Sequence, residues 1–163
     1  MTMTPFRFHA IFQELMDENP FAVRATLRIL QTEFTEVVPT LAVTCEERPR
    51  LLVNLKFVAA NCQTEPHVKA LLCHEFLHVL LRHTEQTTRI SRARHIATDA
   101  VINAIIHRCL GEAYSSMMAT YYEHADGVQR LLRQPREGET RRANLPKAMQ
   151  SASAEVRFAA VWK

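Results

Sequence analysis

The most regular hydrophobic pattern in the chain lies between positions 66 and 84. Its large apolar residues recur at intervals of three and four, which places them on one side of a helix. They are Val68, Leu71, Leu72, Phe76, Val79 and Leu80. No Gly interrupts the segment, and Thr64 followed by Pro66 is typical of a helix start. The pattern predicts a helix that extends to about Thr84.

Two further helices are predicted before this segment. A Thr-Pro pair at positions 4–5 is typical of a cap and first turn, and the helix is expected to end near Asp17. An Asn-Pro pair at positions 19–20 repeats the signal, and the spacing of apolar residues extends this second helix to about Phe34.

β-prone residues then form two runs, Val37–Cys45 and Arg50–Phe57. The short connection between them contains Pro49. We expect the two runs to pair as an antiparallel hairpin.

The rest of the chain is predicted to be helical as far as about position 133. A long helix is expected over 92–110, where Gly111 ends it. One or two helices should follow over 114–133, with a break near 126–127. The elements together predict an α+β protein, mainly helical, with a small sheet. We expect one domain over residues 1–134, then a polar linker and an apolar tail over 135–163.

The helix at 66–84 contains the candidate chemistry. His74, Glu75 and His78 form an H-E-x-x-H pattern, typical of zinc hydrolases. Two His four residues apart project from the same helix face, so both imidazoles can reach a single zinc ion. Glu75 is rotated by about 100° from His74, which suits it to take a proton from a water that the metal activates. We therefore predict His74 and His78 as metal ligands and Glu75 as the catalytic base.

A catalytic zinc usually has a third protein ligand. Asp99 is the preferred candidate, because it lies in a helix that is apolar nearly all round, where a carboxylate needs a partner. His95 is an alternative on the same helix, and Asp99 could instead pair with an Arg. His83 is disfavoured, since in a continuous helix it lies about 180° from His74.

Three runs in this order, 51–54, 74–83 and 96–103, resemble the predicted metallopeptidase domain often joined to a von Willebrand factor A-like domain. The resemblance covers roughly residues 20–110. It implies a compact zincin-like fold whose edge strand lies beside the motif helix, with Asp99 as the acidic ligand. It also implies a zinc-dependent peptidase, one zinc ion per chain and a peptide or protein substrate. The von Willebrand-type domain has no counterpart here, which leaves room for a separate partner protein.

Alternatives remain open at this point. The chain could be a metal-binding regulatory or interaction module with little catalysis. Nucleic acid is disfavoured as a partner, because the net charge is only +3 and the Arg-rich stretches at 89–94 and 130–142 suit solvated loops. The strand near 51–55 is expected to hold an extended peptide. The apolar tail either packs on the domain or occupies the substrate groove.

Composition also bears on location. No apolar run approaches the length of a membrane span, and no secretion signal is evident. The four Cys form no CxxC pair, so free thiols and a cytoplasmic protein are expected.

Overall fold

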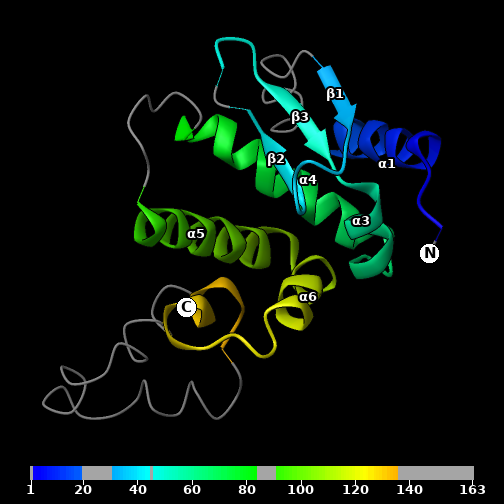
Figure 1. The fold of residues 1–163 in the computed structure, drawn as a ribbon. Helices are drawn as coiled ribbons and strands as arrows, with labels where there is room; N and C mark the ends of the chain where they lie inside the picture. The colour runs from blue at the N-terminus through cyan, green and yellow to red at the C-terminus, as the bar shows by residue number, and fades with distance from the viewer. Residues whose placement is uncertain (1, 20–30, 45, 84–90, 136–163) are drawn as a thin grey trace, which may run out of the picture. The chain divides into compact units, whose positions relative to one another are not determined.

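The computed structural model describes residues 2–19, 31–44, 46–83 and 91–135. The chain divides into two units, Met1–Ile90 and Ser91–Lys163 (Figure 1). The predicted linker and tail lie almost entirely outside the described residues, and a domain over 1–134 stays a prediction.

In the first unit, α1 (Pro5–Glu18) begins where the Thr-Pro pair predicts. Thr4 Oγ1 accepts a hydrogen bond from the Arg7 N–H at 3.2 Å, which caps the first turn. The buried face of α1 packs against α4 (Glu65–Leu80), where Phe12 meets the Phe76 ring edge-on. This contact fixes the position of the helix that carries the H-E-x-x-H motif.

The contact between α1 and α4 also contains one buried charge. Lys69 is 5% exposed, and its Nζ lies 2.8 Å from Glu18 Oε2 and 3.3 Å from Glu14 Oε2. Burial lowers the Lys69 pKa, but the two carboxylates outweigh burial, so the pKa is raised. Because a buried ammonium is costly without such partners, this cluster favours one register of α4 on α1.

The sheet of the described residues has three strands: β1 (Gln31–Phe34), β2 (Leu41–Val43) and β3 (Arg50–Val53). Their order is β1-β3-β2, with β3 parallel to β1 and antiparallel to β2. The predicted hairpin pairing of β2 with β3 is confirmed. The prediction that the second helix continues to Phe34 is wrong, because residues 31–34 pair with β3 as a strand. Residues 20–30, where that helix was expected to begin, lie outside the described part.

Strand β3 ends at Val53, earlier than the predicted run Arg50–Phe57. Asn54 Oδ1 accepts hydrogen bonds from the N–H groups of Lys56 and Phe57, which starts α3 (Leu55–Asn61). An Asn cap of this kind favours helix over strand for the residues that follow it. Phe57 is therefore helical, and the strand prediction for 54–57 is wrong.

The second unit begins with α5 (Arg92–Leu110), as predicted. Gly111 ends it with a φ of 87°, a conformation that glycine adopts at little cost. The helix α6 (Glu112–Tyr121) and the 3₁₀ helix η2 (Gly127–Leu132) follow, which confirms the predicted break before Gly127. Although α5 is apolar nearly all round, it is not buried on every side, since Ala97 and Val101 are exposed.

The predicted class is confirmed: the protein is α+β, mainly helical, with a small sheet. In the first unit α4 lies against β2, so the sheet is beside the motif helix (Figure 1). None of the helices in the described segments is both long and apolar enough to cross a bilayer.

Candidate metal centre

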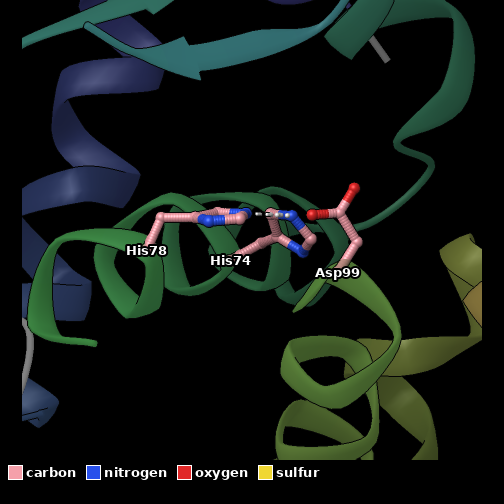
Figure 2. A group of neighbouring side chains, drawn as sticks. All are labelled: His74, His78 and Asp99. Atoms are coloured by element: carbon pink, nitrogen blue, oxygen red, sulfur yellow. Dashed lines mark hydrogen bonds between the residues drawn. The ribbon is translucent and has the colours of Figure 1, made fainter. Parts of the chain in front are cut away.

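The two histidines of the motif meet on α4 as their spacing predicts. His74 Nε2 lies 3.1 Å from His78 Nε2, and the ring centroids are 4.9 Å apart. Figure 2 shows the two rings with the dashed contact between them. Both residues are half-buried, as is Glu75. Such side chains are reachable from solvent while the helix still restricts their orientation.

The separation of these nitrogens suits a shared zinc ion. Two imidazole nitrogens bound at about 2.0–2.1 Å in tetrahedral geometry lie roughly 3.3 Å apart. The observed 3.1 Å requires only a small adjustment. The ring nitrogens that converge are equivalent in the two residues, so a single ion could accept both lone pairs. The donor chemistry therefore fits zinc.

Glu75 is held by the sheet. Its Oε2 accepts a hydrogen bond from the Val43 N–H of β2 at 3.1 Å. Thr44 N–H bonds to Arg50 O, and hydrogen-bonded pairs alternate along an antiparallel ladder. The N–H of Val43 consequently faces away from β3 and is available to α4. The sequence contains no signal for this contact, which joins residues 32 positions apart.

The motif helix ends earlier than predicted. Its last residue is Leu80, and Arg82 has a φ of 58°, in the left-handed region. Helices often end with such a residue, usually Gly, but no Gly closely follows His78 to predict this end. The turn brings His83 Nδ1 to 3.0 Å from His78 Nδ1. The assumption that the helix continues through His83 is thus wrong. His83 contacts Nδ1 of His78, whereas His74 faces Nε2 on the opposite side of the ring.

Asp99 lies on α5 in the second unit, where it is half-buried. Its Oδ2 is 3.5 Å from His95 Nε2, one helical turn earlier, and His95 is exposed. The prediction that Asp99 completes the ligand set with His74 and His78 stays a prediction. Each of the three offers an atom that zinc accepts, an imidazole nitrogen or a carboxylate oxygen.

Two further polar residues of α5, Asn103 and His107, have partners within the second unit. Asn103 is buried and donates to Leu132 O at 2.9 Å, and His107 Nδ1 lies 2.8 Å from Ser115 Oγ. These contacts hold η2 and α6 on α5. Asn103 and His107 thus have structural roles in the second unit.

The sequence offers several groups that could stabilise charge on a substrate carbonyl, with no feature that distinguishes one from another: Tyr114, Tyr121, Tyr122, His107 and His124. Tyr122 is half-buried, and burial, with added effects of Tyr121 and Asp99, raises its pKa to about 12. It therefore stays a phenol that can donate a hydrogen bond. Tyr121 and His124 are exposed.

Cys73 precedes the first motif histidine and is buried. Burial raises its pKa to about 12, opposed by Lys69, so the side chain stays a thiol and not a thiolate ligand. Arg133, part of one Arg-rich stretch, is buried and donates to Gln134 O. It therefore contributes little to any cationic surface.

Comparison with protein-family models, with curated proteins and with solved structures found no match to this chain. The resemblance to a metallopeptidase domain therefore rests on the residues and their order along the chain.

Proposed function

We propose that this protein is a zinc-dependent peptidase with His74 and His78 as ligands, Asp99 as the third ligand and Glu75 as the base. The convergence of the two Nε2 atoms at 3.1 Å carries the proposal. Bound zinc would supply a Lewis acid that polarises a peptide carbonyl and lowers the pKa of a bound water.

Glu75 would move the proton. Its carboxylate lies one residue from His74 on the same half-buried stretch of α4. As an acceptor, it would take a proton from the attacking water and deliver it to the nitrogen of the leaving amine. The hydrogen bond from Val43 N–H restricts the side chain to one orientation before substrate arrives.

The sheet offers a place for an extended substrate, although not where it was expected. The strand near 51–55 cannot accept a peptide, because β3 is paired on both sides by β1 and β2. Among the described strands, β2 is the outer one that lies against α4. We propose that an extended peptide pairs with the outer edge of β2, where its hydrogen bond with Val43 N–H would replace the one that Glu75 accepts in its absence.

One observation favours a second candidate, a metal-binding regulatory or interaction module. Glu75 has a structural partner in Val43 N–H, so its position on α4 is explained without catalysis. Under either function, the free thiols of Cys62, Cys73 and Cys109 suit the reducing cytoplasm that we propose as its location.

The test is to measure metal content and peptide hydrolysis on the same purified protein. We expect about one zinc per chain, and cleavage of a mixture of unstructured peptides that stops on chelation and returns with zinc. Zinc without cleavage would favour the second candidate. Protein that takes up no zinc would remove both.

Replacing Asp99 tests the third ligand. The Asp99→Ala variant is expected to bind zinc at least roughly 100-fold more weakly. Loss of a residue that only orients a ligand costs about 10- to 100-fold, and this variant loses a ligand itself. His95→Ala is the control, because His95 contacts Asp99 but is exposed. Competition with a chromophoric chelator measures both affinities. Wild-type affinity in Asp99→Ala would exclude Asp99 from the site.

A further inference from the structure

The ring of His78 has a contact at each of its two nitrogens. Nε2 faces His74 Nε2 at 3.1 Å, and Nδ1 faces His83 Nδ1 at 3.0 Å. The His78 and His83 rings meet edge-on, at 67° with centroids 5.1 Å apart. His83 is half-buried, as His78 is. His78 is therefore oriented from the side opposite to the proposed metal.

Ligation decides which nitrogen of His78 carries the proton. A neutral imidazole has one N–H, so a ring that binds metal through Nε2 carries its proton on Nδ1. That N–H then points at His83 Nδ1, which must accept it. His83 in turn keeps its own proton on Nε2.

The backbone supports this arrangement. Arg82 lies between the end of α4 and His83. Its φ is 58°, a backbone conformation that residues other than Gly adopt at some energetic cost. In a continuing helix, His83 would be about 140° around the axis from His78. The left-handed turn at Arg82 instead returns the chain toward the ring.

We propose that His83 is a positioning residue, which accepts a hydrogen bond from His78 Nδ1–H and so presents His78 Nε2 to the metal. The inference rests on the proposed zinc site but concerns a residue outside its ligand set. Metal-ligating histidines commonly have such a partner, whose loss weakens metal binding by about 10- to 100-fold. His83 cannot bind the same ion while it holds Nδ1 of His78.

Two substitutions that introduce side chains of similar size distinguish the role of the hydrogen-bond acceptor from the role of side-chain volume. The amide oxygen introduced by His83→Asn would lie close to the position of Nδ1, whereas the side chain introduced by His83→Leu would fill the space without an acceptor. His83→Leu is expected to weaken zinc binding about 10- to 100-fold, and His83→Asn to stay within a few-fold of wild type. The cobalt-substituted protein adds a second readout: its visible absorption should shift in His83→Leu and stay near wild type in His83→Asn.

Equal affinities and spectra for both variants would overturn the proposal, whether both match wild type or both are weakened. The melting temperature of the metal-free variants shows whether either is simply unfolded. A measurement on the zinc-loaded wild type avoids that concern: nitrogen NMR with ¹⁵N-labelled histidine should find the proton of His78 on Nδ1 and that of His83 on Nε2. A proton on His83 Nδ1 would overturn the proposal.

Failure of this inference differs from failure of the proposed function. If wild type takes up no zinc, the metal site itself is wrong. If wild type binds zinc and loses it in His74→Ala, but His83→Leu behaves like His83→Asn, only the role of His83 is wrong.

Discussion

Replacing either His74 or His78 by Ala is expected to weaken zinc binding by roughly two to three orders of magnitude. Structural zinc sites are worth about 10–16 kcal/mol in total, so one ligand among three or four contributes roughly 3–4 kcal/mol. Loss of one imidazole should then weaken binding roughly 100- to 1,000-fold. The two Nε2 atoms are 3.1 Å apart, so neither histidine can be removed without leaving the other as an isolated ligand on α4. Elemental analysis of each variant beside wild type measures the effect.

His67 provides a matched control for these variants. It lies on α4 two turns before His74, and burial lowers its pKa. Its Nδ1 accepts a hydrogen bond from Gln63 N–H at 3.3 Å, at the start of the helix. His67→Ala should therefore keep full zinc occupancy. Full occupancy in His74→Ala and His78→Ala as well would show that the motif does not hold the metal.

Glu75→Gln is expected to retain zinc and to lower peptide hydrolysis roughly 100- to 10,000-fold. The amide keeps the shape of the side chain, and its oxygen can still accept from Val43 N–H, but it cannot take a proton from water. Zinc content and cleavage rate should be measured on the same preparation. Hydrolysis at the wild-type rate would mean that Glu75 is not the base.

Glu75→Ala separates the two roles of this residue. It removes both the proton acceptor and the hydrogen bond to β2, so it should also lower the free energy of unfolding by about 0.5–1.5 kcal/mol. Glu75→Gln should lose much less stability. If Glu75→Ala alone loses stability and wild type hydrolyses no peptide, Glu75 serves mainly to hold α4 on the sheet. Equal loss of stability in both variants would show that the hydrogen bond from Val43 N–H is not the source of the effect.

Local signals in the sequence were sufficient for several elements. The Thr-Pro pair at positions 4–5 and Gly111 mark helix ends that the structure confirms. Both act within one helical turn, through a capping side chain or a permissive backbone, and need no distant partner. The same holds for the pair of histidines at four-residue spacing, because the helix alone brings their nitrogens together.

Other features depended on partners far along the chain. The apolar spacing that leads up to Phe34 is compatible with a helix, yet β3 pairs with residues 31–34, and that pairing outweighs the local preference. Asn54 is a local signal for the start of a helix, since its side chain caps α3 directly. The hydrogen bond from Val43 to Glu75 has no sequence signature, because it depends on which edge of β2 faces α4.

The sequence by itself determined the helix that carries His74, Glu75 and His78 and the side of it on which the two imidazoles meet, since a helical repeat is a local property. Only the tertiary structure decided how those side chains are held. The turn at Arg82 that returns His83 to His78 lacks the Gly that usually marks it, and the N–H that restrains Glu75 comes from a strand that the chain brings back onto α4. Such contacts arise from packing between distant segments, which residue spacing along one segment does not encode.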